Sequence, residues 1–311
     1  MNKLKVAFFG TPDITIPSLE LLNDRNDIEL HTIVTMPDRP AGRGNNLKSP
    51  IVAEFAKKHN INLIQSNNIN KDIDKLDNDF DLIIVFAFSQ FLNSKILDLP
   101  KLGCFNIHTS LLPKYRGAAP IQYALLNGDK STGVSIQKMV KKMDAGDIAH
   151  SLSIEIKKEW KAPELYEELK TLSQNCLNEF LNMALKNSIS FKTQDESQVS
   201  FAPTIKKTDG FIDFKSSTRN DVLNKLRAFM PWPGIYCFLN KKRLKIFEIE
   251  SEPIPLDPGY CSTDFGSLAV GVLDGTLRLK EIQIEGKKAC SDSELINGLK
   301  SSNTDVIINP E

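Results

Sequence analysis

The chain has 311 residues, of which 41% are hydrophobic and 25% are charged, and its 39 basic and 39 acidic side chains give a formal net charge of zero. This length is sufficient for two domains, each with its own apolar core. The apolar runs fall short of the roughly 18 residues that a membrane-spanning helix needs. A neutral chain has no overall field that attracts nucleic acid, so any such contact requires local basic patches.

The cysteine and histidine patterns argue against two common kinds of site. The five cysteines are scattered and include no C-x-x-C pair, which favours reduced thiols over a disulfide framework or a zinc site. The four histidines show no metal-ligand spacing, so we expect no metal. The N-terminus leads directly into a strand pattern without the core of a signal peptide. We therefore expect a cytoplasmic protein.

The first half of the chain alternates short apolar strands with helices. Residues 6–10 have the pattern of a buried strand that ends in glycine, and a helical pattern begins after Pro12. A strand, a glycine and a helix in this order predict the opening of a doubly wound α/β domain with a mostly parallel sheet. Only one glycine of the dinucleotide-binding G-x-G-x-x-G motif is present, which argues against a nicotinamide or flavin cofactor.

Residues 37–48 form a long segment rich in proline, glycine and asparagine. It contains one acid, Asp38, and three cations, Arg39, Arg43 and Lys48. Loops of this length within a compact domain are usually functional or mobile. Two interpretations stay open: a solvated connector, or an arm that folds against a phosphate-rich partner through bidentate contacts of Arg43.

Further strands and one long helix complete the first domain. Residues 81–88 are nearly continuously apolar, which is typical of a central parallel strand that is covered on both faces. Apolar residues recur at helical spacing from 162 to 187 and predict a long amphipathic helix that closes the domain. The other expected strands are residues 28–35, 61–65, 104–108, 133–140 and 148–156.

A polar cluster is expected at the end of one predicted strand. Residues two apart in an extended chain share a face, so Asn106 and His108 project from the same side, with Ser110 just beyond them. Alone, this pattern also describes a core histidine satisfied by a neighbouring amide. Asp144, in the loop after the strand at 133–140, adds a carboxylate that can hold the imidazole tautomer and favour its cationic form. Together, an amide, an imidazole and a carboxylate are suited to stabilising an oxyanion while a proton moves.

Three parts of the chain resemble the folate-dependent formyltransferases: Asn106-x-His108-x-Ser110-Leu111-Leu112-Pro113, Arg116-Gly117-Ala118-Ala119-Pro120-Ile121, and the downstream Asp144. The resemblance covers nearly the whole chain. It is greatest to the methionyl-tRNA formyltransferases, which also carry the stretch Asp38-Arg39-Pro40-Ala41-Gly42-Arg43-Gly44. It implies transfer of the formyl group of 10-formyltetrahydrofolate to the amine of methionyl initiator tRNA, with Asn106, His108 and Asp144 as the catalytic residues.

The same resemblance assigns binding residues. It implies a folate cleft at the strand ends, and tRNA contacts in the 37–48 segment, in a basic linker and in the C-terminal domain. The implied folate-binding residues are Phe86, Phe88, Ser110, Leu111, Leu112 and Pro113. The implied tRNA-binding residues are Arg39, Arg43, Lys206, Lys207, Lys241, Lys242 and Arg243.

The expected organisation has three parts. Residues 1–188 would form the Rossmann-like formyltransferase domain, residues 189–208 a polar linker, and residues 209–311 a C-terminal domain. Short apolar runs with turn punctuation predict that this last domain is a small β-barrel, and the resemblance implies an OB-like barrel that binds tRNA. Because acidic residues slightly outnumber basic ones there, its basic cluster at 241–245 is also consistent with a solvated face.

Two positions depart from the family pattern. Ala87-Phe88-Ser89 replaces the usual Ala-Tyr-Gly, and we expect folate binding to persist because an aromatic wall remains. Thr109 replaces the glycine that usually separates the histidine from the serine. Either the backbone there is ordinary extended chain, or a β-branched residue is strained at positive φ. We expect the first, because strand periodicity continues through position 109.

Three other functions share some of these features. A relative with the same donor could formylate a small acceptor, such as an amino sugar or glycinamide ribonucleotide, but the 37–48 segment and the C-terminal domain count against this. A hydrolase of the formyl donor would need neither the basic 37–48 segment nor the basic linker. A non-catalytic RNA-binding protein on the same fold would not need Asn106, His108 and Asp144, and all three are present. We expect a monomer without a membrane partner.

Overall fold

The computed structural model describes residues 3–41, 46–264, 266–301 and 308–309. The chain forms two compact units. The first comprises residues 1–120, 131–156 and 166–203, and the second comprises residues 121–130, 157–165 and 204–311. None of the described helices is both long enough and apolar enough to span a membrane.

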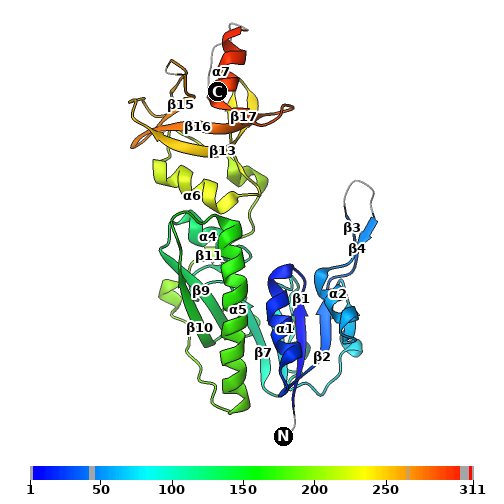
Figure 1. Ribbon diagram of the computed structural model, residues 1–311. Coiled ribbons are helices and arrows are strands. Elements are labelled where there is room, and N and C mark those ends of the chain that lie inside the picture. The colour runs from blue at the N-terminus through cyan, green and yellow to red at the C-terminus, as the bar shows by residue number, and fades with distance from the viewer. Residues whose placement is uncertain (1–2, 42–45, 265, 302–307, 310–311) are drawn as a thin grey trace. The chain divides into compact units, whose positions relative to one another are not determined.

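A seven-stranded sheet forms the centre of the first unit (Figure 1). Its strands are β1 (Leu4–Gly10), β2 (Ile28–Thr35), β5 (Asn62–Gln65), β6 (Leu82–Phe86), β7 (Gly103–His108), β9 (Ser131–Lys138) and β10 (Ile148–Glu155). They lie in the order β10-β9-β7-β6-β1-β2-β5. The strands from β7 to β5 are parallel, whereas β9 and β10 are antiparallel to their neighbours. The predicted doubly wound, mostly parallel fold is confirmed.

Helices cover this sheet. Figure 1 shows α1 (Ile16–Asp24) and the long α5 (Ala162–Leu185) on the same face. They are neighbours there, because Arg25, at the end of α1, donates hydrogen bonds to Asn178 Oδ1 at 2.6 Å and to Asn182 Oδ1 at 2.9 Å. The shorter elements of this unit are α2 (Ile51–Lys58), α3 (Ser94–Leu97) and the 3-10 turns η1 (Asp13–Thr15), η2 (Ile73–Lys75) and η3 (Glu196–Gln198).

The middle of the sheet is buried on both faces. Every residue of β6 is at most 4% exposed, as its near-continuous apolar sequence predicts. Towards α5, Phe105 of β7 packs against Phe180 with ring centroids 4.7 Å apart. Burial of each large apolar side chain contributes roughly 1.5–3 kcal/mol, so these layers hold the strand ends in place.

The segment 37–48 is a hairpin and not the loop that the sequence indicated. Its strands β3 (Arg39–Ala41) and β4 (Asn46–Lys48) pair in antiparallel fashion, and they are too short for a period of two to be visible in the sequence. Asp38, at the base of the hairpin, accepts a hydrogen bond from Gln65 Nε2 at 2.6 Å, which holds the pKa of this carboxyl below its ordinary value. Arg43 lies outside the described residues.

An antiparallel sheet forms the centre of the second unit. Its strands are β12 (Ile235–Leu239), β13 (Lys242–Glu252), β14 (Cys261–Ser262), β15 (Ala269–Val272), β16 (Gly275–Ile284) and β17 (Cys290–Ser291). They lie in the order β12-β13-β16-β15-β14, and β17 also pairs with β16. This arrangement confirms the expected small, OB-like barrel domain, although the two-residue strands β14 and β17 were not predicted.

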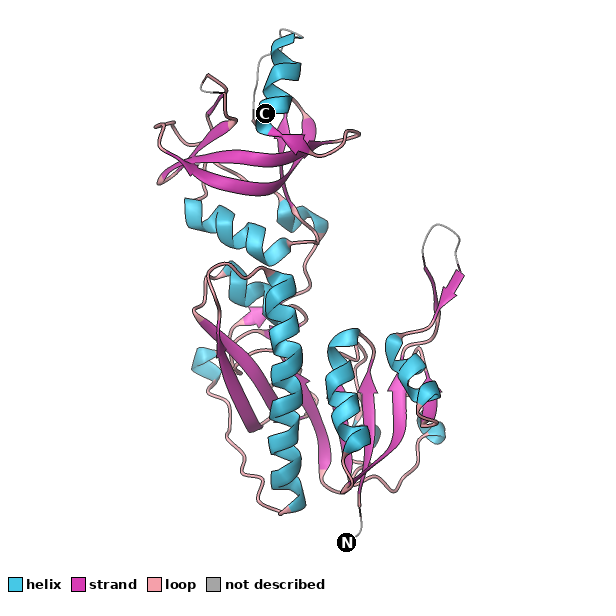
Figure 2. Ribbon diagram, in the orientation of Figure 1, coloured by secondary structure: helices cyan, strands magenta, loops and turns pink. Residues whose placement is uncertain are grey.

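Two helices of the second unit were missed in the sequence. Figure 2 shows α6 (Arg219–Phe229) on one side of the sheet and α7 (Asp292–Ser301) on the other. The start of α6 has a readable signal, because Thr218 Oγ1 accepts a hydrogen bond from Asp221 N at 3.1 Å and Asp221 accepts one from Thr218 N at 2.8 Å. A further short helix, α4, spans Pro120–Leu126.

Candidate active site

Polar side chains gather on one face of the sheet where β7 and β9 lie side by side. The register of these antiparallel strands pairs Asn106 with Gln137 and His108 with Ser135. Because directly paired residues project from the same face, these four side chains lie together. Asn106 is half-buried and the other three are buried.

Asp144 completes this cluster from the connection between β9 and β10. Asn106 Nδ2 donates a hydrogen bond to Asp144 Oδ1 at 3.3 Å, and His108 Nδ1 lies 3.8 Å from Asp144 Oδ2. The structure thus brings together the three residues expected to be catalytic. The His108 and Asp144 side chains are only 6% and 11% exposed, so bulk water screens their electrostatic interaction weakly.

The connection that carries Asp144 approaches from an unexpected direction. Since β9 runs antiparallel to β7, its last residue, Lys138, pairs with Phe105, and Met139 N donates to Cys104 O at 2.8 Å. The connection therefore leaves the sheet near the amino end of β7 and folds back over its face. On this return Asp144 has a φ of 50°, a left-handed conformation that is uncommon outside glycine.

Two further donors hold the Asp144 carboxylate. Gln137 Nε2 donates to Oδ1 at 2.8 Å, and Gly117 N donates to Oδ2 at 2.9 Å. Gly117 has a φ of 126°, and a Cβ there would lie 2.6 Å from Ala202 O, so only glycine fits. Gln137 was not predicted from the sequence, because it is one of several polar residues in β9 and its signal was weak.

The partners of His108 determine its tautomer. Nε2 lies 2.9 Å from Tyr115 O, and a carbonyl oxygen can only accept a hydrogen bond, so Nε2 carries a hydrogen. Nδ1 faces the Asp144 carboxylate at 3.8 Å, which is longer than a direct hydrogen bond. Nδ1 is therefore the nitrogen that can take up or release a proton, and a carboxylate is placed to stabilise the imidazolium that results.

The turn after β7 is held by hydrogen bonds among its own residues. Ser110 is fully buried, and its Oγ donates to Lys114 O at 2.6 Å, so this hydroxyl shapes the turn. Leu112 is also buried, whereas Leu111 and Pro113 are half-buried. Thr109 is not among the described residues with positive φ, which confirms that threonine is accommodated there without left-handed strain.

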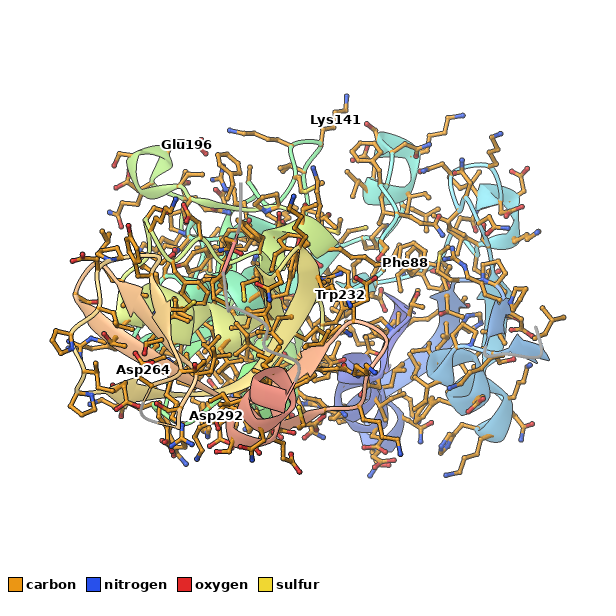
Figure 3. All side chains as sticks on the ribbon, turned by 90° about the horizontal axis from the view of Figure 1, so that it is seen from above. Phe88, Lys141, Glu196, Trp232, Asp264 and Asp292 are labelled. Atoms are coloured by element: carbon orange, nitrogen blue, oxygen red, sulfur yellow. The ribbon has the colours of Figure 1, made fainter. Side chains whose placement is uncertain are left out.

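The expected aromatic wall is not formed by the rings of Phe86 and Phe88. Each is 2% exposed, and Phe88 packs edge-on against Phe9 with centroids 5.3 Å apart, within the apolar core (Figure 3). The cause is the backbone, because Ala87 and Ser89 have φ values of 50° and 61° and turn the intervening ring inward. The exposed residues at this strand end are Ala87 and Ser89 themselves.

The expected tRNA-binding cations belong to both units. Arg39 is exposed in the first unit, and Lys206, Lys207, Lys241 and Lys242 are exposed in the second. The guanidinium of Arg243 lies 3.7 Å from the centroid of the Tyr236 ring. The implied cations therefore do not converge on one cluster within a single unit.

The remaining histidines have partners of their own. His31 pairs with Asp77, His59 stacks on Phe55, and His150 pairs with Glu179. Across the described residues, no group of three or more His, Cys, Asp or Glu side chains is arranged to hold a metal ion.

Family models match both units of the chain. Residues 4–181 match the model described as Formyl transferase, and residues 204–300 match the model described as Formyl transferase, C-terminal domain. The methionyl-tRNA formyltransferase of Geobacter sulfurreducens is 36% identical over 306 residues, which cover 96% of this chain and 95% of that protein. The protein of the same name from Thermotoga maritima is 39% identical over 303 residues, 95% of each chain.

Solved structures share the fold at lower identity. WlaRD, a sugar 3N-formyl transferase, has a TM-score of 0.67 at 19% identity, over 93% of this chain and 100% of that one. The N-formyltransferase from Helicobacter canadensis, in complex with folinic acid and dTDP-3-aminofucose, has a TM-score of 0.66 at 18% identity, over 90% and 99% of the two chains. At these identities the likeness establishes the fold alone.

Proposed function

The chain belongs to the formyl transferase family, and from this membership we propose that it transfers the formyl group of 10-formyltetrahydrofolate to the amine of methionyl initiator tRNA. Relatives named for methionyl-tRNA formylation match it over 95% or more of its length, second unit included. The observation that carries the proposal is the cluster of Asn106, His108 and Asp144 on the face of β7. The attacking group is the amine of the substrate itself, so the protein needs no nucleophilic side chain.

Asn106 stabilises the charge that develops on the formyl oxygen. Its amide has two hydrogens, and one is donated to Asp144 Oδ1 at 3.3 Å, so the second is available to the substrate. Negative charge grows on the formyl oxygen as the amine attacks the carbon. One well-placed donor contributes roughly 3–4 kcal/mol to such a transition state.

His108 moves the proton. Nδ1 takes it from the attacking amine as the new C–N bond forms, and returns it to the folate nitrogen as the old C–N bond breaks. Nε2 remains bonded to Tyr115 O through both steps, so the ring keeps its orientation. Asp144, 3.8 Å from Nδ1, stabilises the cationic ring between them.

We assign the folate contacts to the strand end beside His108. Phe86 pairs with Ile107, so the next residue, Ala87, comes level with His108. Ala87 is an exposed residue whose backbone has hydrogen-bonding groups of the kind that orient a flat heterocycle, and half-buried Leu111 offers apolar contact. These residues suit a pteridine, which has a polar edge and an apolar face.

The β3–β4 hairpin is the proposed tRNA contact of the first unit. Arg39 and Lys48 are paired directly across the hairpin, and both are exposed. Like charges in this position destabilise an isolated strand pair, and a polyanionic partner removes the repulsion. Arg43, between the two strands, is assigned to the same contact from the sequence.

One face of the β12–β13 pair is the proposed tRNA contact of the second unit. Tyr236 and Phe238 are two apart on β12, and the register sets Arg243 of β13 opposite Phe238, so all three share this face. Tyr236 holds the Arg243 guanidinium by a cation–π contact of 3.7 Å. With exposed Lys241 in the turn and exposed Lys242 at the start of β13, this end of the strand pair suits a phosphate backbone with accessible bases.

The division of labour follows from these assignments. We propose a formyltransferase domain at residues 1–188, a connecting segment at 189–208 whose first part packs on that domain and whose Lys206 and Lys207 contact the tRNA, and a tRNA-binding domain at 209–311. The family models support this division because they end at residue 181 and resume at residue 204. We also propose that the protein acts as a monomer in the cytoplasm, where charged initiator tRNA is found.

The test is a formylation assay with separate acceptors. Purified protein is mixed with 10-formyltetrahydrofolate and methionyl initiator tRNA, methionyl elongator tRNA, an amino-sugar nucleotide or no acceptor. We expect formylmethionine on the initiator tRNA, a much lower rate on the elongator, and no consumption of donor when the acceptor is omitted. Formylation of the amino sugar alone would indicate a sugar formyltransferase instead. Release of formate without acceptor would indicate a hydrolase of the formyl donor.

A further inference from the structure

The segment that follows α5 packs against the connection that carries Asp144, although its composition resembles a linker. Lys192 and Ile148 exchange two backbone hydrogen bonds of 2.9 Å at the start of β10. Two residues later Gln194 is 7% exposed, and its Nε2 donates to Asp144 O at 2.9 Å and to Gly146 O at 2.7 Å. One side-chain amide thus holds the backbone carbonyls on both sides of Ala145.

Arg116 determines which way this amide faces. Its Nε and Nη2 both donate to Gln194 Oε1, at 3.1 Å and 2.8 Å. Because a guanidinium has only donors, the oxygen of the amide must face Arg116 and the nitrogen must face the Asp144 connection. Arg116 is 2% exposed, so the charged side chain that orients Gln194 is itself buried.

An ion-pair network joins Arg116 back to the same connection. Arg116 Nη2 donates to Glu196 Oε1 at 2.8 Å, and Glu196 Oε2 accepts from Lys142 Nζ at 3.0 Å. Lys142 lies two residues before Asp144, so the contacts close a ring around the connection. Glu196 is well exposed, at the margin of the molecule in Figure 3, whereas Arg116 and Gln194 form the buried part of the ring.

Arg116 also adjoins the donor to the carboxylate. The next residue, Gly117, donates its N–H to Asp144 Oδ2 at 2.9 Å. Arg116 is therefore linked to Asp144 twice, through Gln194 to its backbone and through Gly117 to its side chain. Its Nη1 is buried and has no hydrogen-bond partner among the described residues.

We propose that Arg116 and Gln194 are positioning residues, which hold Asp144 in its left-handed conformation so that its carboxylate faces His108. The inference rests on the role of Asp144 in the proposed function. The connection needs such support because it folds back over the sheet from the far end of β9, and Asp144 keeps a φ of 50° there. A carboxylate displaced by an ångström no longer stabilises the imidazolium at the correct distance.

The first test replaces Gln194 by the similarly sized Gln194→Met, which cannot donate to the two carbonyls. We expect kcat to fall about tenfold or more, with KM for both substrates changed less than about threefold. Gln198→Met is the matched control, because Gln198 is an exposed glutamine of the same segment that hydrogen-bonds only to Asp195 among the described residues. Arg116→Lys keeps the charge but loses the planar guanidinium. We expect it to lower kcat with little change in KM, as for Gln194→Met.

Two further measurements separate positioning from general stability. In the Asp144→Asn background, Gln194→Met should lower kcat little further, because both substitutions disable the same interaction between residue 144 and His108. A purely structural role predicts the same loss in both backgrounds. Hydrogen exchange followed by mass spectrometry should be faster in Gln194→Met at residues 139–147 while the exchange of β7 is unchanged, and this readout does not depend on catalysis.

The outcomes distinguish the inference from the function on which it rests. If Asp144→Asn is inactive but Gln194→Met and Arg116→Lys turn over normally, the positioning role is overturned and the function stands. If Asp144→Asn is itself fully active, the role of Asp144 fails and the inference fails with it. If Gln194→Met does not fold, Arg116→Lys, measured alone and in the Asp144→Asn background, still decides the question.

Discussion

His108 has one nitrogen that can change its protonation state without losing a partner. Nε2 is engaged by Tyr115 O at 2.9 Å, whereas Nδ1 faces a carboxylate across 3.8 Å. The imidazole ring is therefore held to the backbone at Nε2, and its Nδ1 is left to exchange a proton with the substrate. This geometry gives each member of the cluster a separate task.

Removing the imidazole should abolish most of the proton transfer. His108→Ala is expected to lower kcat by about two orders of magnitude or more, with the folate KM changed only a few-fold. Steady-state kinetics on methionyl initiator tRNA, with circular dichroism to verify folding, measures this effect. A His108→Ala protein with near-normal turnover would exclude the mechanism.

The ion pairs of Glu196 should make the stability of the protein depend on pH. The hydrogen bond from Arg116, and next that from Lys142, hold the pKa of Glu196 at about 2, below its ordinary 4.5. A carboxyl whose folded pKa is lowered contributes stability above its unfolded pKa, and the contribution is lost as the pH falls towards 2. Glu196→Gln should therefore have a slightly lower Tm than the wild type at pH 7, and the difference should vanish on acidification. A difference that stays constant down to pH 2 would show that charge is not its cause.

At the scale of elements, the β3–β4 hairpin concentrates charge on a small projecting structure. Its strands are three residues long and are anchored at the base through Asp38 and Gln65. The pairing of Arg39 with Lys48 means that two cations share one side of a narrow ribbon. Contact with phosphates would remove the repulsion between these two cations.

This arrangement predicts a selective effect on the acceptor. Arg39→Ala should raise the KM for methionyl initiator tRNA several-fold at low salt and leave folate binding unchanged, and the effect should shrink as salt is added. Lys58→Ala, an exposed lysine at the end of α2, is the matched control. Equal effects of Arg39→Ala and Lys58→Ala would mean that the hairpin is only a connector and does not contact the tRNA.

The elements also show what could be read from the sequence. Strands such as β6 and the helix α5 were predictable because long apolar periodic patterns reflect burial directly. The hairpin was missed because three-residue strands have no visible period. Gln194 was missed because a polar residue in a polar segment carries no local sign of the distant carbonyls that it holds, and Gln137 left only a weak sign.

The cluster of Asn106, His108 and Asp144 was predictable from the sequence, whereas the position of the Phe88 ring was not. Asn106 and His108 could be placed together from strand geometry alone, and Asp144 joined them as expected. The prediction that Phe88 forms an aromatic wall of the folate cleft was wrong. The left-handed backbone at Ala87 and Ser89 turns its ring into the core. Tertiary packing sets local backbone conformations of this kind, and the periodicity of apolar residues in the sequence does not predict them.

At the scale of the whole molecule, a net charge of zero leaves recognition to small patches. In the second unit we propose this role for the face of Tyr236, Phe238 and Arg243, together with Lys241 and Lys242 beside it. Binding there would be sensitive to single substitutions, because no general positive field compensates for the loss of one contact.

Substitutions on this face should weaken tRNA binding without changing chemistry. Phe238→Ala and Arg243→Ala are each expected to raise the Kd for methionyl initiator tRNA by about three- to thirtyfold, with single-turnover rates at saturating tRNA preserved. Lys215→Ala, an exposed lysine elsewhere in the same unit, should change neither quantity. Loss of the saturated rate would instead mean that these residues support the fold.

The pairing of β8 (Arg116–Gly117) with β11 (Phe201–Ala202) has a practical consequence for dissecting the protein. A fragment cut where the first family model ends, at residue 181, or at the end of the composition-defined domain, at residue 188, would lack Gln194 and β11. Asp144 would then lose its anchor, and Gly117 would lose the strand that sets its conformation. A fragment that is to retain these supports of Asp144 must therefore extend at least through Ala202, well beyond its last long helix.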